Sequence, residues 1–499
     1  MKRRGKPGLT GRLGLHPLAW HGFFASALIA FGSWGVGWFP RNQLSALARS
    51  GFFVQFRTDL FGVLLCIAAM AAGIVWLMRT WLLARPWVGG SADLDAKQQG
   101  KLIAMWAAPL MLSYPILSRD VYSYLAQGRM LEAGKSPYTS GISVLPGWFD
   151  GGADGLWAQS PSPYGPFFLV LSRWIYVASG GVPEIGIGLL RIVAVIGVIG
   201  CYFFTVKLAA KLNHNTHWAV WAVVGNPLFL LTMVGGVHND ALMIAGVFWA
   251  FLLAYEKKPI WATLALALAV SIKPIVLVLL PFLGLALIGA QAAMRQRIMN
   301  WVKITCYSAL WLLIIGAVTN LWFGWFPAMF TAGDAAFPYA PVGLLGWSLG
   351  NLAQVLGGSF ALTQQVVVTA FQLLALALVA KFALAKDTSN PLRLSAWALS
   401  AVVLLSPLIQ PWYVLWLIAL FAMSKQLSAG SERLMIWVTS AILVAVYVDQ
   451  LSIEQWYTVW LLKAVAAVLI IGLMLAMYRF DTRVRWVLRL EQEPQSKSH

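Results

Sequence analysis

Apolar runs of nearly twenty residues recur along this chain from Trp20 to Tyr478. The hydrocarbon core of a bilayer is about 30 Å thick, so a helix needs roughly 20 apolar residues to cross it. Hydrophobic residues make up 60% of the 499 positions and charged residues only 11%, whereas soluble domains have about half and about a quarter. Nothing between the runs is long enough to fold as a separate soluble domain. The sequence therefore predicts an all-α polytopic membrane protein surrounded by membrane lipids.

The distribution of charge predicts how the chain is threaded through the membrane. A formal net charge of +18 would suggest a nucleic-acid partner in a soluble protein, but here the basic residues gather in short loops that alternate along the chain. Short cytoplasmic loops carry an excess of Lys and Arg. Because these loops account for the positive charge, no nucleic-acid partner is expected. Applied to the apolar runs, the rule predicts two cytoplasmic termini and about 14 crossings. The expected spans are approximately 16–38, 59–79, 102–117, 185–207, 217–234, 241–256, 260–273, 274–290, 304–322, 362–384, 394–409, 411–424, 434–448 and 456–478.

We expect three parts along the chain. Residues 1–101 form a cytoplasmic segment and two retained helices, residues 102–425 a membrane core, and residues 426–499 the last helices and a cytoplasmic tail. The core includes an external loop over residues 118–181. Within it, the stretch 164–180 is helical in pattern, but counting it as a crossing would reverse the sidedness of the loops that follow. An interfacial helix is therefore favoured over a span.

The external loop opens on the string S-R-D-V-Y-S-Y-L-A-Q-G-R-M-L-E, where an apolar run ends. If the chain is helical from Asp120, the 100° step places Asp120, Ser123, Tyr124 and Gln127 on one face of an amphipathic helix. An acid at a helix start can simply cap the helix, and Arg119 could steady it. Alternatively, Asp120 is a general base that accepts a proton from an attacking hydroxyl at the membrane surface.

The string G-G-V-H-N-D places His238, Asn239 and Asp240 together at an expected external turn. Such a dense group of donors and acceptors could bind sugar hydroxyls, or it could only hold a tight turn. Metal ligation is a weaker interpretation, because the three residues are adjacent rather than spaced as metal ligands usually are.

Two further groups combine polar or aromatic residues with a position near the membrane surface. Lys273 lies in S-I-K-P-I between two short apolar runs, and Arg191 has a similar position. An ionisable group at membrane depth is expensive, so either residue could bind a phosphate or extend its charge to the headgroups. Gln410, Trp412 and Tyr413 follow an apolar run, where aromatic residues form an interfacial belt or stack on a sugar ring or prenyl chain.

Taken in order, these strings resemble the polyprenyl-phosphate-mannose-dependent α-1,6-mannosyltransferases, which are membrane glycosyltransferases of the GT-C class. The resemblance rests on S-R-D-V-Y-S-Y with A-Q-G-R-M-L, then S-P-Y-G-P, N-P with G-G-V-H-N-D-A-L-M, K-P and P-W-Y, over residues of about 100 to 425. It implies a GT-C fold and inverting transfer of mannose from a polyprenyl-phosphate donor to a glycan or glycolipid acceptor. The site would lie on the external face of the cell membrane.

The resemblance also implies roles for the residues of these strings. Asp120 would be the catalytic base, and the donor phosphate would be bound by Lys273, Arg191 and Arg119. The sugar or acceptor would be bound by Tyr124, Gln127, Tyr164, His238, Asn239, Asp240, Gln410, Trp412 and Tyr413. Some GT-C enzymes carry a second acid beside the base and use a divalent metal, but here Val121 follows Asp120, so no cofactor is expected and a divalent metal is not favoured.

Two rival functions remain open at this point. A multi-pass transporter or lipid flippase would also have many helices and a broken pair around Lys273. Such a protein should show repeat symmetry with charges facing each other near the midplane, whereas the acids here are concentrated in the expected external loops. A GT-C enzyme that uses another lipid-phosphate sugar is the second rival, because pocket contacts rather than these strings set the identity of the sugar.

Overall fold

The computed structural model describes residues 16–86, 94–331, 340–454 and 458–489, and within these ranges the chain forms helices and no strand. Residues 1–15 of the expected cytoplasmic segment and residues 490–499 of the expected cytoplasmic tail lie outside these ranges. The first half contains α2 (Pro17–Val36), α3 (Gly51–Thr58), α4 (Leu60–Leu83), α5 (Ala96–Ala107), η1 (Pro109–Leu112), α6 (Asp120–Glu132), η2 (Ile142–Val144), η3 (Gly155–Trp157), α7 (Pro166–Ala178), α8 (Pro183–Lys211), α9 (Thr216–Val223), α10 (Pro227–Leu230), η4 (Leu231–Gly235) and α11 (Asp240–Tyr255). The second half contains α12 (Pro259–Val270), η5 (Pro274–Leu279), α13 (Leu280–Ile288), α14 (Met294–Thr319), α15 (Trp325–Thr331), α16 (Pro341–Val355), α17 (Phe360–Ala383), α18 (Pro391–Leu404), α19 (Tyr413–Ser424), α20 (Ala429–Asp449), α21 (Val459–Phe480) and α22 (Thr482–Arg489).

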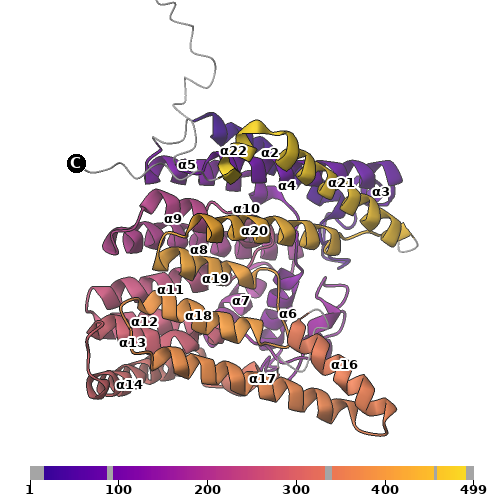
Figure 1. Ribbon diagram of the computed structural model, residues 1–499. Coiled ribbons are helices and arrows are strands. Elements are labelled where there is room, and N and C mark those ends of the chain that lie inside the picture. The colour runs from indigo at the N-terminus through magenta and orange to yellow at the C-terminus, as the bar shows by residue number, and fades with distance from the viewer. Residues whose placement is uncertain (1–15, 87–93, 332–339, 455–457, 490–499) are drawn as a thin grey trace, which may run out of the picture.

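The long helices run side by side through the molecule (Figure 1). The chain starts with α2, α4 and α5 along one edge, crosses to α14 and α17 at the opposite edge, and returns so that α21 and α22 pack on α4. The short helices α6 and α7 lie in the interior between these edges. Segments far apart in the sequence therefore meet around α6.

Six described helices are long and apolar enough to cross a membrane, namely α4, α8, α14, α17, α20 and α21. The pair made by α9 and the segment Pro227–Gly235 would be a seventh, bent by 53°. The bend has a local cause, because Pro227 lacks the N–H that would continue the helix. The Asn226 side chain accepts from the Leu228 N–H and donates to Thr439 on α20, at 2.9 and 3.1 Å. The broken backbone is thus satisfied inside the protein, as the membrane interior requires.

All but one of the expected spans coincide with helical segments of the structure, although several of these are only 10 to 17 residues long. The exception is 102–117, because α5 ends at Ala107 and the chain is not helical after η1, over residues 113–117. Lys273 separates α12 from the 3₁₀ helix η5, so the expected break between residues 260–273 and 274–290 is confirmed. The prediction that α6 is a surface amphipathic helix is wrong in one respect. Both of its faces are buried by protein, with Val121 and Tyr122 as inaccessible as Asp120 and Ser123. The cover comes from α7, α8 and the loop after α6, which periodicity alone does not reveal.

Candidate active site

Asp120 is the first residue of α6, and its carboxylate is not used to cap that helix. The N-cap residue is Arg119, whose side chain makes no capping hydrogen bond, and the Asp120 N–H donates to the Ser118 hydroxyl at 3.1 Å. The Asp120 side chain is 8% exposed, accepts from the Tyr164 hydroxyl at 3.5 Å and lies 3.7 Å from Nδ1 of His238. A buried carboxylate without strong local partners among the described residues can accept a proton from a ligand.

The Asp120 carboxylate lies in the wall of a cavity of about 150 Å³. The lining comes from α6 (Asp120, Ser123, Gln127), the loop before α7 (Trp157, Ser160, Pro161, Pro163, Tyr164), the break after α12 (Lys273, Ile275), α15 and α17 (Met329, Gln372), and the start of α19 with the loop before it (Ser406, Pro407, Leu408, Gln410, Trp412, Tyr413, Trp416). Among these lining residues Asp120 is the one carboxylate and Lys273 the one basic side chain. The cavity therefore pairs a proton acceptor with a cation.

The Lys273 ammonium is buried by protein and has a fixed partner. It donates to Oδ1 of Asp240 at 2.7 Å, and its side chain is 8% exposed. The aromatic rings of Tyr164, Tyr413 and Trp416 surround it, with centroids 5.8, 5.4 and 4.9 Å from Nζ. Ring faces stabilise a cation electrostatically. Lys273 is thus held in one place at the edge of the cavity.

His238, Asn239 and Asp240 lie behind this wall rather than in it. The His238 ring packs on Trp412 with centroids 4.1 Å apart, and Nδ1 lies 3.5 Å from Oδ2 of Asp240. Asp240 also accepts from the Trp416 indole N–H at 2.7 Å. The side chain of Asn239, the N-cap residue of α11, makes no capping bond. These three residues position the residues that line the cavity.

Several buried polar atoms around the cavity have no hydrogen-bond partner among the protein atoms that the structure describes. These atoms are Ser123 Oγ, Gln127 Oε1, Trp412 Nε1, both ring nitrogens of His238 and both amide atoms of Asn239. Buried polar groups in native proteins are nearly always paired. Their concentration here is typical of a site that binds a polar ligand.

Two glycines let backbone segments approach closely enough to build the site. A Cβ on Gly236 would lie 2.7 Å from the Thr232 carbonyl oxygen and 2.9 Å from that of Ile116, so only glycine fits where the segment before His238 crosses the segment before Asp120. Gly165 packs on the backbone of Ser271, where a Cβ would collide, and its N–H donates to the Ile272 carbonyl at 3.0 Å. The glycines therefore bring four separate strings of the sequence to one place.

The backbone is strained on both approaches to this place. Leu117, three residues before Asp120, has φ of 63°, and Val237, directly before His238, has φ of 60°. A positive φ is a genuine outlier for a β-branched residue, and such strain clusters at functional sites.

Burial is the main influence on the proton affinity of Asp120, which lies outside the candidate spans. Burial raises the pKa of Asp120 above its ordinary value, His238 and Lys273 lower it, and Asp240 and Asp154 raise it further. A carboxyl group with a raised pKa is a better proton acceptor than a surface carboxylate.

The structure brings most of the predicted site residues together, but not all. Asp120, Lys273 and the residues Gln127, Tyr164, Gln410, Trp412 and Tyr413 line the cavity, and Tyr124 packs edge-on against Tyr164 behind it. Trp412 is 5% exposed, so it is not part of a lipid-facing belt.

The two predicted phosphate-binding arginines lie elsewhere. Arg191 donates to the carbonyls of Met111 and Val234 at 2.9 and 3.1 Å, and Arg119 donates to those of Gly152 and Ala153 at 2.9 and 2.8 Å. Their guanidinium groups hold loops together around the site.

Sequence reasoning missed Trp416 and Gln372. Trp416 lies one helical turn after Trp412 and Tyr413, so the 3.6-residue period of α19 could have identified it. Gln372 is one of several polar residues of α17 and lines the cavity from there. Within the described residues, no group of three or more His, Cys, Asp or Glu is arranged to hold a metal, and transfer without a metal stays a prediction.

Comparison with known proteins gives matches over most of the chain. Residues 19–289 match the family described as "Alpha-(1->6)-mannopyranosyltransferase, N-terminal domain", and residues 340–476 match the "MptB C-terminal domain". Alpha-(1->6)-mannopyranosyltransferase A of Mycobacterium tuberculosis is 27% identical over 439 residues, which cover 84% of this chain and 82% of that protein. The A and B proteins of Corynebacterium glutamicum are 36% and 26% identical over 192 and 433 residues, covering 38% and 80% of this chain and 39% and 71% of their own lengths.

No solved structure matches this chain. The first family match covers more than half of the sequence, so the chain belongs to the alpha-(1->6)-mannopyranosyltransferase family.

Proposed function

We propose that this family member transfers mannose from a polyprenyl-phosphate donor to a glycan or glycolipid acceptor on the non-cytoplasmic face of the membrane, forming α-1,6 links with inversion. The names of its relatives support mannosyl transfer. The observation that carries the rest of the proposal is the cavity that Asp120 and Lys273 line together. Among the described lining residues, Asp120 is the one carboxylate and Lys273 the one cation. Inverting transfer from a phosphate donor needs one group of each kind.

In the proposed step, an acceptor hydroxyl oxygen attacks the anomeric carbon of the donor while the bond from that carbon to the phosphate oxygen breaks. The hydroxyl proton passes to the Asp120 carboxylate, and the bonding electron pair leaves with the polyprenyl phosphate. Attack opposite to the leaving group inverts the anomeric centre, so an α link requires a β-linked donor. General-base catalysis of this kind contributes about 10²- to 10⁴-fold to a rate.

Lys273 stabilises the charge that develops on the leaving phosphate. Its hydrogen bond to Asp240 and the three rings around it fix its position before the donor binds. A preorganised cation in a site of low dielectric stabilises a transition state more than a mobile surface cation does. Asp240 keeps the ammonium in place without lining the cavity.

The remaining lining residues supply sugar recognition. Trp412 and Tyr413 present aromatic surface, and the unpaired Ser123 hydroxyl and Gln127 amide oxygen are free to bond sugar hydroxyls. Tyr164 links the two parts of the site, because its hydroxyl reaches Asp120 while its ring faces Lys273.

We further propose a GT-C fold with about 14 crossings, both termini in the cytoplasm and the cavity facing outward. Support comes from the six long apolar helices, the bent pair and five of the shorter apolar helices. The sixth shorter helix, α7, is the one expected to be interfacial and is not counted. The alternation of basic loops in the sequence is the reason for the chosen orientation.

The donor class can be tested with purified full-length protein and a short α-mannoside acceptor. Polyprenyl-phosphate-mannose should support transfer, whereas GDP-mannose at the same concentration should give none. Activity with the nucleotide sugar alone would overturn the lipid-phosphate donor. A third arm with polyprenyl-phosphate-glucose tests the sugar, and equal rates with both lipid donors would contradict selection of mannose.

A further inference from the structure

A second cavity, of about 560 Å³, lies between α18, α19 and α20 and shares no lining residue with the catalytic cavity. Along α19 its wall extends from Val414 to Lys425. At a rise of about 1.5 Å per residue this is roughly 16 Å, close to half of the 30 Å hydrocarbon core. We call this elongated cavity the α19 furrow. Its length corresponds to one leaflet of a membrane.

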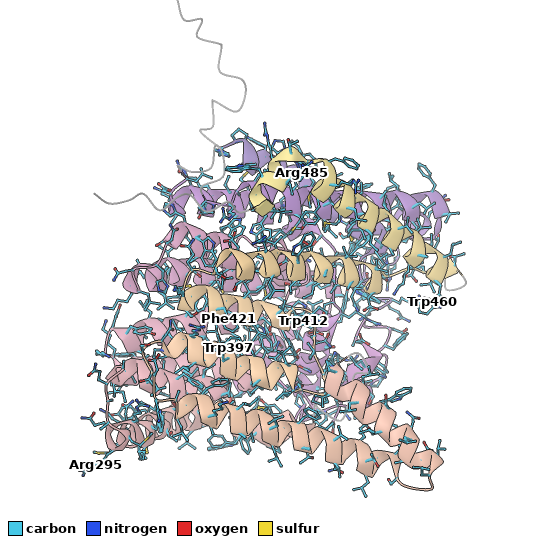
Figure 2. The ribbon with its side chains drawn as sticks, in the orientation of Figure 1. Arg295, Trp397, Trp412, Phe421, Trp460 and Arg485 are labelled. Carbon is cyan, nitrogen blue, oxygen red and sulfur yellow. The ribbon has the colours of Figure 1, made fainter. Side chains whose placement is uncertain are left out.

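The long part of the α19 furrow is lined by apolar side chains, some of which are exposed. Trp397 of α18 packs edge-on against Phe421 of α19, with ring centroids 5.0 Å apart, and Figure 2 shows the two side chains on neighbouring helices with Trp412 toward the other end of α19. Trp397 is 46% exposed and Leu434 of α20 63% exposed. Large apolar side chains left accessible on membrane helices are in contact with lipid chains.

One end of the furrow is polar and positively charged. Arg393, in the first turn of α18, and Lys425, which follows the last residue of α19, both line it and are exposed. Neither forms an ion pair within the described part of the chain, and no acid is among the furrow's lining residues there. Ser428 and Ser431 at the start of α20 add hydroxyls at the same end, and a helix N-terminus favours an anion.

We propose that the α19 furrow binds an anionic glycerophospholipid of the cytoplasmic leaflet, with its phosphate between Arg393 and Lys425 and an acyl chain along α19. A free anion would leave the apolar wall without a partner, whereas a neutral lipid would leave two cations unpaired. The site is separate from the proposed reaction and does not depend on it. The basic loop that carries Lys425 also places this end on the cytoplasmic side.

A polyprenyl phosphate is the other amphipathic anion to consider. In the proposed reaction its phosphate lies at Lys273, near the opposite end of α19 and at the opposite face of the membrane. The furrow spans roughly one leaflet, which suits an acyl chain better than a long isoprenoid. Polyprenyl phosphate is therefore a competitor in the test rather than the proposed occupant.

The test titrates purified full-length protein with phosphatidylglycerol or with phosphatidylcholine of the same acyl chains, and counts bound lipid by native mass spectrometry. For the first lipid molecule that binds, wild type should bind phosphatidylglycerol about tenfold more tightly than phosphatidylcholine, because two cations face the headgroup. The variant with Arg393→Gln and Lys425→Gln should lose this preference. A matched control with Lys97→Gln and Lys101→Gln on α5, exposed cations outside the furrow, should keep it.

A second variant tests the acyl chain separately. Leu417→Trp narrows the furrow and leaves both cations in place, so it should weaken binding of both lipids. Its elution profile and mannosyl transfer should match those of wild type, which shows that it folds. Three results would overturn the proposal: equal binding of the two lipids by wild type, a preference that survives loss of Arg393 and Lys425, or displacement of phosphatidylglycerol by equimolar polyprenyl phosphate or inorganic phosphate.

Discussion

Two buried carboxylates flank His238, and their different hydrogen-bond partners suit them to different roles. Asp240 accepts from Lys273 and from Trp416, both at 2.7 Å, and is fully buried. Asp120 has only the longer contacts to Tyr164 and His238 among the described residues, and it lines the cavity. Asp240 is thus held as an anion by its partners, whereas Asp120 is available to accept a proton.

The role of Asp120 as the proton acceptor predicts how kcat/KM depends on pH. Burial raises the pKa of Asp120, so the acidic limb of kcat/KM, below which the base is protonated, should lie above the ordinary Asp value of about 3.9. Lys273 lowers the pKa of Asp120. Lys273→Met removes that effect, so the limb should move to higher pH while kcat falls.

The control for this pH profile is Lys303→Met, an exposed lysine on α14, which should leave the limb in place. A limb that stays fixed in Lys273→Met, or that moves to lower pH, would show that Lys273 does not act on the titrating base.

At the scale of elements, the site depends on close crossings of backbone at glycine. Gly165 lies against the backbone of Ser271, two residues before Lys273, and directly follows Tyr164. Gly165→Ala should push these segments apart and separate Tyr164 from Lys273. A displacement of about 1 Å near the chemistry costs roughly a hundredfold in rate, so kcat/KM should fall by that order.

Gly155→Ala is the matched control. Gly155 lies in the same loop before α7, and a Cβ at that position would meet no atom within 4 Å. Its kcat/KM should equal that of wild type. If both variants were equally active, the crossing at Gly165 would not position the site.

The sequence predicts helices more completely than it predicts what covers them. The spans follow from runs of apolar residues, and the break at Lys273 follows from the charge and the proline at that point. The burial of α6 could not be predicted, because α7 and a long loop cover it. Arg191 illustrates the same limit: its sequence position resembles that of Lys273, and only the fold shows that it bonds the carbonyls of Met111 and Val234.

At the scale of the whole molecule, the proposed orientation predicts which loops reach the external medium. In a Cys306→Ser background the remaining cysteines, Cys66 and Cys201, are buried. Lys135→Cys, in the exposed turn after α6, should react with an impermeant thiol reagent in intact cells. Lys97→Cys on α5 should react only after the membrane is permeabilised, and the reverse pattern would invert the topology.

The central claim is that Asp120 is the base of mannosyl transfer, and Asp120→Asn tests it most directly. Transfer from polyprenyl-phosphate-mannose should fall by about 10²- to 10⁴-fold, while donor binding is retained. Folding should not suffer at neutral pH: a raised pKa means that the charged carboxylate costs stability above that pKa, and Asn removes this cost.

The matched control for this measurement is Asp150→Asn, an exposed acid in the segment between α6 and α7, which should transfer at the wild-type rate. The account predicts a folded, donor-binding Asp120→Asn protein that does not transfer mannose. An Asp120→Asn protein that transfers mannose as fast as Asp150→Asn would contradict it.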